Sequence, residues 1–121
     1  MKTFKQLINE AIQFDNEEEF DGLPLSASIR EGKVKNGSKK ITDQSSIIVV
    51  CDYPLDGEYE FTLKSSGGFT KQQFYSKLRD LYSTIIYKNA NKYGIWGHSI
   101  RDLSLESVSI RGGKYYPNIG S

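Results

Sequence analysis

The stretch FTKQQFYSKLRDLYSTIIYKNANKYG, residues Phe69–Gly94, decides the fold because it has the signals of one long helix. Thr70 and Gln73 have the T-x-x-Q spacing of a capping box. Gly94 lies where a left-handed C-cap is expected, just beyond the last residue of the apolar pattern. The sequence therefore predicts a helix that starts after Thr70 and extends for roughly 36 Å at about 1.5 Å per residue.

Two apolar stripes run along this expected helix. The first is at helical spacing, and the second lies beside it and is rich in tyrosine. A face this wide can cover a sheet, and it has two interpretations. Either both stripes belong to the core, or the second stripe packs against another subunit. The first stripe is Phe74, Leu78, Leu81 and Ile85, and the second is Tyr75, Tyr82, Ile86 and Tyr93.

The chain before the long helix predicts a short helix followed by strands. Thr3 to about Phe14 repeats the capping box and has one apolar face. The acidic run Asp15–Glu19 is interpreted as a solvated linker. Leu25–Arg30 alternates apolar and polar residues, which predicts a half-buried strand. Asn36-Gly37 predicts a hairpin turn, and the four lysines around it are either a solubilising tip or a funnel for anions.

Further strands follow on both sides of the long helix. Ser46–Cys51 is a continuous apolar run, which predicts a central strand buried on both faces. Tyr59–Lys64 alternates and predicts a half-buried strand. In the C-terminal part the apolar phase changes near Glu106-Ser107, which predicts a bulge. Gly112-Gly113 predicts a hairpin turn between two final strands, Val108–Arg111 and Lys114–Tyr116.

These elements predict an α+β fold in one domain over residues 1–121. An antiparallel sheet of about five or six strands is covered by the short N-terminal helix and the long helix. The chain ends in a C-terminal β-hairpin.

One constellation has clear chemical content. Ser107, Ser109 and Arg111 share the polar side of their strand, and Ser26, Ser28 and Arg30 repeat the pattern. Two such strands facing each other, within or between subunits, would line a pocket with two guanidiniums, which suit phosphate oxygens. Tyr115 and Tyr116 follow and could stack on a base. The alternative is that these are ordinary exposed arginines.

The usual catalytic constellations are missing. His98 is the one histidine, so neither a metal cluster nor a Ser-His-Asp triad is expected, and we interpret it as a structural hydrogen-bonding residue. No phosphate loop or dinucleotide fingerprint occurs. The formal charge of +1 counts against nucleic acid, and no apolar run has the length of a membrane span. With Cys51 as the one cysteine, we expect a cytoplasmic binding protein without cofactor, metal or membrane.

The order of sheet, long helix and C-terminal hairpin, with the tail SIRGGKYYPNIGS, resembles the phage-encoded Thoeris anti-defence sponges of the first type. Those proteins sequester cyclic ADP-ribose isomers, and some also bind cyclic oligonucleotides. The resemblance implies a homo-oligomer with ligands between subunits and arginines that grip phosphates. Carried over to this chain, it implies these ligand-binding residues: Arg30, Arg111, Tyr115, Tyr116, Phe74, Tyr82 and Asn91.

The resulting hypothesis is a phage anti-defence protein that acts in the host cytoplasm. It would bind and sequester a small cyclic nucleotide immune signal without hydrolysing it. The alternative is an inhibitor that binds a host protein through an exposed aromatic helix face, the second stripe. A third interpretation, nucleic-acid binding through the lysine-rich turn, is disfavoured by the near-zero net charge.

Overall fold

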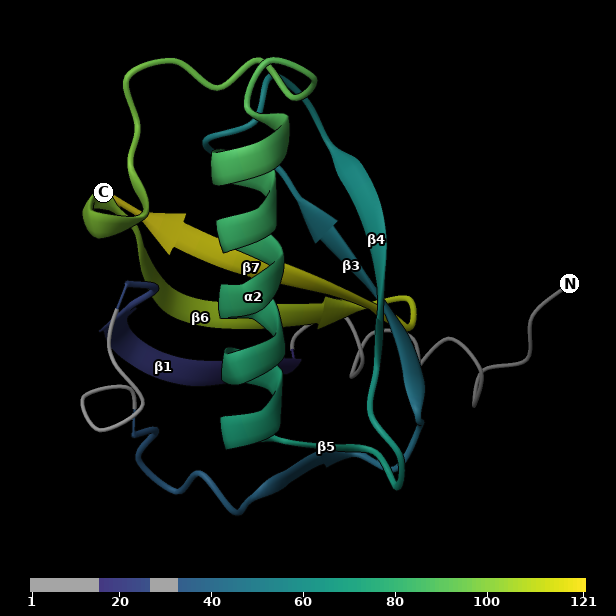
Figure 1. Cartoon of the computed structure of the whole chain (residues 1–121). Coiled ribbons are helices and arrows are strands. Elements are labelled where there is room, and N and C mark those ends of the chain that lie inside the picture. The colour runs from purple at the N-terminus through teal and green to yellow at the C-terminus, as the bar shows by residue number, and fades with distance from the viewer. Residues whose placement is uncertain (1–15, 27–32) are drawn as a thin grey trace, which may run out of the picture.

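The structure is a computed structural model that describes residues 16–26 and 33–121. The expected N-terminal helix and most of the expected strand Leu25–Arg30, with Arg30 itself, lie outside the described residues. The elements, labelled as in Figure 1, are β1 (Asn16–Pro24), β2 (Lys40–Thr42), β3 (Ser46–Cys51), β4 (Tyr59–Lys64), β5 (Phe69–Thr70), α2 (Lys71–Asn89), the 3₁₀ turn η1 (Ile100–Asp102), β6 (Ser104–Arg111) and β7 (Lys114–Gly120).

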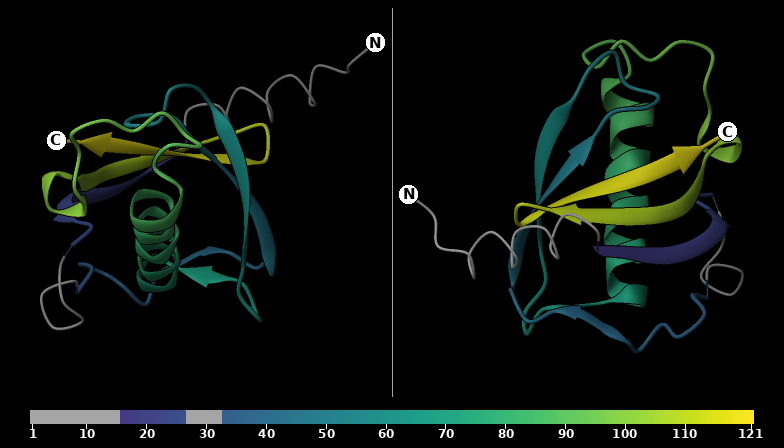
Figure 2. Two further views of the ribbon diagram at one scale, coloured as in Figure 1. Left: turned by 45° about the horizontal axis from the view of Figure 1, so that its top comes forward. Right: turned by 180° about the vertical axis from the view of Figure 1, so that it is seen from behind.

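Five strands form the main sheet, in the order β1-β6-β7-β3-β4. The pairings are antiparallel except for β3 and β7, which run parallel, so the expectation of a purely antiparallel sheet was wrong at that point. β2 and β5 form a separate two-stranded sheet at the N-terminal end of α2. α2 covers one face of the main sheet (Figures 1 and 2), and we call the opposite face the outer face. No helix in the described ranges has the length and apolarity needed to cross a membrane.

The start of α2 confirms the capping box. Thr70 Oγ1 accepts from the N–H of Gln73, and the Gln73 side chain accepts from the N–H of Thr70. The next two free N–H groups, of Lys71 and Gln72, donate to the carbonyls of Lys39 and Gly37. All four of these N–H groups are thus satisfied by the chain itself, and no anion is needed at this helix end.

The end of the helix confirms the expected role of Gly94. Residues 90–93 form a turn that continues the helix beyond Asn89. The N–H of Ile95 donates to the carbonyl of Ala90, and the N–H of Gly94 donates to that of Asn91, which is the Schellman pattern. Gly94 has a φ of +67°, as this motif requires.

Both apolar stripes of α2 are in the core. Tyr75 and Tyr82 are fully buried, and Ile86 and Tyr93 are only 9% exposed. The interpretation that both stripes belong to the core is therefore confirmed, and the alternative, that the second stripe faces another subunit or a host protein, was wrong. The sheet curves around α2 (Figure 2) and needs a wide apolar face to fill the space beneath it.

Cys51 faces Tyr82 in this core. Burial raises the pKa of the Cys51 thiol to about 12, so the thiol stays protonated and unreactive. Burial likewise raises the pKa of Tyr82 well above its ordinary value. The Tyr82 hydroxyl makes no hydrogen bond of normal geometry, and the thiol beside it is a weak partner at best.

From Asn16 on, where the described residues begin, the acidic run is part of a strand and not a linker. β1 pairs with β6, with Glu17 opposite Ser109. Phe20 anchors it in the core at 4% exposure, and Glu18 pairs with Lys39 at 3.0 Å. The residues that β1 pairs with are distant in the sequence. The charges alone therefore predicted a solvated linker, because no nearby residue indicated a partner strand.

The turn at Asn36 is present, but it does not join two adjacent strands. The N–H of Lys39 donates to the Asn36 carbonyl, and β2 then pairs with β5. The predicted hairpin at this position was therefore wrong. Lys39 binds Glu18, and Lys40 lies 3.7 Å from Asp43, so two of the four lysines already have a carboxylate.

The remaining predicted strands are confirmed at their expected places. β3 is internal to the sheet, but Ile48 is 38% exposed, so the strand is not buried on both faces throughout. β4 alternates as expected. The pairing of β6 with β7 shifts between Leu105 and Ser107, which is the expected bulge, and Gly112-Gly113 closes their hairpin.

Candidate functional site

The tip of the β6–β7 hairpin brings two of the predicted ligand-binding residues together. Arg111 ends β6 opposite Lys114, and Tyr116 lies on β7 two pairs further from the turn, opposite Ser109. The guanidinium carbon of Arg111 is 4.0 Å from the centre of the Tyr116 ring. Both side chains belong to the outer face, because alternate residues of a strand share a face.

A hollow of about 400 Å³ lies beside this pair. Besides Arg111 and Tyr116 it is lined by Glu58, Gly112 and Lys114. The turn is formed by Gly112 and Gly113, whose positive φ angles favour glycine. Because glycine has no side chain, nothing from the turn fills the space. Lys114 and Gly112 are lining residues that the sequence analysis missed, although Lys114 directly follows the two glycines that it had singled out.

The charges at the hollow favour an anion. Lys114 binds Glu60, and this hydrogen bond raises the pKa of the lysine above its ordinary value. Arg111 has no carboxylate partner within the described ranges. Its guanidinium, which has five N–H donors, contacts the Tyr116 ring. Glu58 is the one acidic residue that lines the hollow.

The serines of the predicted constellation have a different role. Ser107 is buried, donates to Glu17 Oε1 at 2.7 Å and accepts from Asn118 Nδ2 at 2.7 Å. The same amide of Asn118 lies 3.3 Å from Ser109 Oγ. These bonds tie β1, β6 and β7 together across the outer face, so Ser107 and Ser109 connect strands and do not line the hollow.

The other predicted ligand-binding residues are not at the hollow. Tyr115 is 5% exposed on the core face, and its ring centre lies 6.0 Å from that of Phe74, which is fully buried. Tyr82 is buried against Cys51. Asn91 lies in the turn after α2, at the far end of the helix from β5 (Figure 1). Phe74, Tyr82 and Tyr115 are therefore core residues, and assigning them to ligand binding was wrong.

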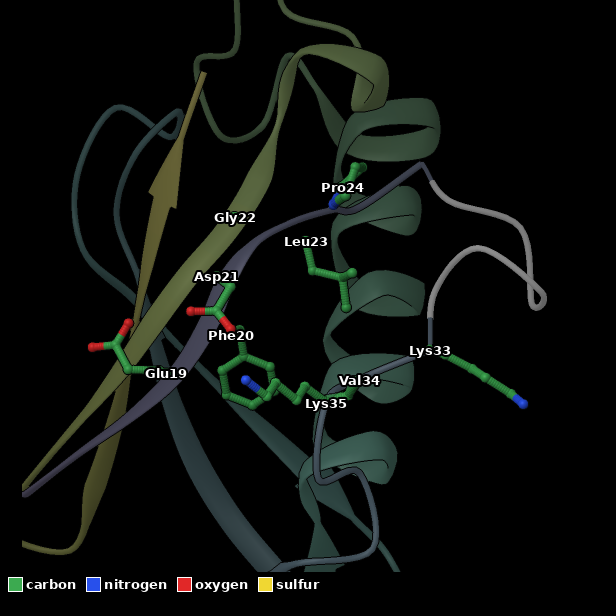
Figure 3. A pocket seen from close by; sticks show the side chains of 9 residues that line it. All are labelled: Glu19, Phe20, Asp21, Gly22, Leu23, Pro24, Lys33, Val34 and Lys35. Atoms are coloured by element: carbon green, nitrogen blue, oxygen red, sulfur yellow. The ribbon is translucent and has the colours of Figure 1, made fainter.

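A second pocket, of about 370 Å³, lies between β1 and the segment that begins at Lys33. In Figure 3, Phe20 and Leu23 extend from β1 toward this space, whereas Lys33 extends away from it. Asp21 and Gly22 both have positive φ, which marks the bulge that shapes the wall. The lining contains two lysines, Lys33 and Lys35, and two acids, Glu19 and Asp21, so its formal charge is zero and it suits an anion less than the hairpin tip does.

His98, the one histidine of the sequence, packs against Tyr53. Its ring meets that of Tyr53 edge-on, with 5.4 Å between centres. Across residues 16–26 and 33–121 no group of His, Cys, Asp and Glu side chains is arranged to hold a metal ion. The neighbouring Trp96 is 83% exposed, a feature that the sequence analysis did not predict.

Comparison of the chain with protein-family models, with curated proteins and with solved structures found no match. The resemblance to the Thoeris sponges therefore stays a prediction.

Proposed function

We propose that this protein binds a small cyclic nucleotide signal at the β6–β7 hairpin tip and withholds it from its receptor. In this proposal it is a phage anti-defence protein whose ligand is a cyclic ADP-ribose isomer or a cyclic oligonucleotide. The observation that carries the proposal is the stacked pair of Arg111 and Tyr116 beside Lys114, at a hollow of about 400 Å³.

The pair suits a phosphate for a physical reason. Stacking on the Tyr116 ring holds the planar guanidinium in one orientation, so less side-chain entropy is lost when a phosphate binds. A guanidinium without a carboxylate partner can offer two parallel N–H donors to phosphate oxygens. Lys114 also lines the hollow, and a second phosphate of the ligand would share its ammonium with Glu60.

The chemistry of arginine also supports binding of the ligand without hydrolysis. Arginine keeps its proton at ordinary pH, so it binds phosphate well and transfers protons poorly. His98 lies in the loop that follows α2, where its ring contacts Tyr53. The hollow lies at the β6–β7 turn, and His98 does not line it. A sponge needs only affinity, and a nanomolar dissociation constant corresponds to about −12 kcal/mol.

The protein-binding alternative loses its basis, because the aromatic stripe on which it rested is buried.

Calorimetric titration with a cyclic ADP-ribose isomer and with a cyclic dinucleotide tests the proposal. We expect Arg111→Ala to weaken binding by at least ~1.5 kcal/mol, roughly tenfold, the low end for a hydrogen bond to a charged group. Tyr116→Ala should weaken it as well, and Tyr116→Phe should not, because the ring remains. Arg101→Ala is the matched control, since Arg101 is also exposed but belongs to η1. Equal affinity of Arg111→Ala and wild type, or no binding by wild type, would contradict the proposal.

Recovery of the ligand separates storage from catalysis. Excess protein is incubated with ligand overnight, the loss of free ligand is confirmed, and the sample is heated to unfold the protein. Chromatography should return the intact ligand in near-stoichiometric yield. A hydrolysed product that depends on His98 would mean that the protein is an enzyme.

A further inference from the structure

The main sheet has two edges, β1 and β4, and they differ in how well they are protected. β1 is bulged between Glu19 and Leu23, with two consecutive residues at positive φ, and ends in Pro24. Its run of three glutamates would face like charges in a self-pairing. Bulges, proline and charges are the devices that prevent an edge from adding another strand.

β4 has none of the backbone devices. Its six residues pair with β3 in continuous register, from Cys51 opposite Tyr59 to Ser46 opposite Lys64. No backbone hydrogen bond of β4 goes to any segment other than β3 within the described part of the chain. β4 is the last strand in the order of the main sheet. Its outward N–H and C=O groups are therefore free to pair with a further strand.

The side chains of β4 complement those of a second copy of the same strand. If two β4 strands pair antiparallel about Thr62, Glu60 of each copy lies opposite Lys64 of the other. On the core face, Phe61 lies opposite the second copy's Leu63. Opposite residues of an antiparallel pair share a face, so this register keeps polar and apolar faces separate, whereas a shift by one residue would mix them.

In the single chain, the residues that would form these charged and apolar contacts are still partly exposed. Lys64 is exposed and has no ion pair in the described ranges, and Glu60, bound to Lys114 on one side, keeps 52% of its side chain exposed. Phe61 is only half-buried, although it packs edge-on against Tyr93 with 5.6 Å between ring centres. A second β4 would cover Phe61 and place a second ammonium beside Glu60.

We infer that this protein forms a two-fold symmetric homodimer in which the two β4 strands pair antiparallel about Thr62 and join the two sheets into one. The two-fold axis is perpendicular to the sheet, so both α2 helices lie on the same side. None of the pairing residues Glu60–Lys64 lines the hollow at the hairpin tip, so the inference rests on the sheet edge and not on the nucleotide site; Glu60 does bind Lys114, which lines the hollow, so Lys64→Glu is the variant that leaves the nucleotide site untouched.

Two charge reversals test the register. In Lys64→Glu, a glutamate would face Glu60 of the second copy, and in Glu60→Lys, a lysine would face Lys64. Each variant alone should dimerise at least ~10-fold more weakly than wild type, because two attractive cross-strand pairs become repulsive. An equal mixture of the two variants should recover wild-type affinity to within a few-fold, since every pair in the heterodimer has opposite charges. Lys88→Glu, an exposed change of the same sign on α2, is the control.

Sedimentation equilibrium from low micromolar to several hundred micromolar concentration measures these effects, with circular dichroism to show that each variant is folded. Hydrogen exchange at the two ends of that range should show concentration-dependent protection confined to residues 58–66. A wild-type chain that stays at 13.7 kDa throughout would overturn the inference. So would a dimer that both single variants retain, or a mixture that does no better than either variant, because the interface would then lie elsewhere.

Discussion

At the scale of single residues, Gly94 is where the end of the helix and the loop after β3 come closest. A Cβ at this position would lie 2.5 Å from Oδ2 and 2.6 Å from Cβ of Asp56. Asp56 cannot move away easily, because its N–H donates to the Tyr93 carbonyl at 2.8 Å and its carboxylate accepts from Tyr59. Gly94 is therefore required both by its positive φ and by its neighbour.

Gly94→Ala should destabilise the protein by about 2–4 kcal/mol, from left-handed strain plus overpacking. Gly97 separates the two causes, because it has the same φ of +67° but nothing within 4 Å of an added Cβ. Gly97→Ala should therefore cost only about 1–2 kcal/mol. Chemical denaturation measures both, and equal losses would mean that Asp56 moves aside at no cost.

At the scale of elements, α2 depends on donors and acceptors at its ends as much as on its apolar face. The Thr70 side chain satisfies one of the three first-turn N–H groups, and carbonyls of the preceding loop satisfy the other two. This arrangement fixes the helix start relative to β2 and β5, because Lys39 lies next to β2. The cap thus contributes to tertiary structure as well as to the helix.

Thr70→Ala should lower the free energy of unfolding by about 1 kcal/mol, the typical loss for an N-cap. Thr84→Ala is the matched control within the same helix. Its hydroxyl donates to the Asp80 carbonyl at 3.1 Å and it is exposed, so alanine should be neutral or slightly stabilising there. Thermal and urea unfolding compare the two, and equal effects would show that the cap makes no special contribution.

At the scale of the whole molecule, an aromatic contact joins the first strand, the helix and the last strand. The Phe74 ring of α2 lies with its centre 5.9 Å from that of Phe20 and 6.0 Å from that of Tyr115. These residues are far apart in sequence and belong to β1, α2 and β7. Their contact fixes how the sheet curves over the helix, and so where the hairpin tip lies.

Phe74→Ala should cost about 3–5 kcal/mol, as expected for removing a buried ring from a packed core. Tyr87→Ala, on the same helix but 69% exposed, should change stability by less than about 0.5 kcal/mol. Denaturation of both variants tests this. If Phe74→Ala were as stable as wild type but bound nucleotide less well, Phe74 would be a ligand-binding residue after all.

Of the candidate site, the sequence supplied Arg111, because strand alternation places it on the polar side of its strand. It supplied Tyr116 only together with Tyr115, because both tyrosines follow the turn, and the structure places only Tyr116 at the hollow. It also assigned Tyr115 and Phe74 to the ligand, since composition does not distinguish an aromatic residue that stacks on a base from one that fills the core. Lys114 and Gly112 were missed, because which residues surround a hollow depends on the turn geometry.

The sequence by itself determined the elements whose signals are local: α2 with its capping box and its glycine C-cap, β3, β4, the bulge in β6 and the β6–β7 hairpin. Only the tertiary structure decided that the three glutamates Glu17–Glu19 belong to strand β1, that both stripes of α2 are buried, and that β3 runs parallel to β7. The physical reason is the range of the interactions. A cap or a tight turn is completed within a few residues, whereas Glu17 is satisfied by Ser107, 90 residues away, and burial is set by the whole sheet that closes around the helix.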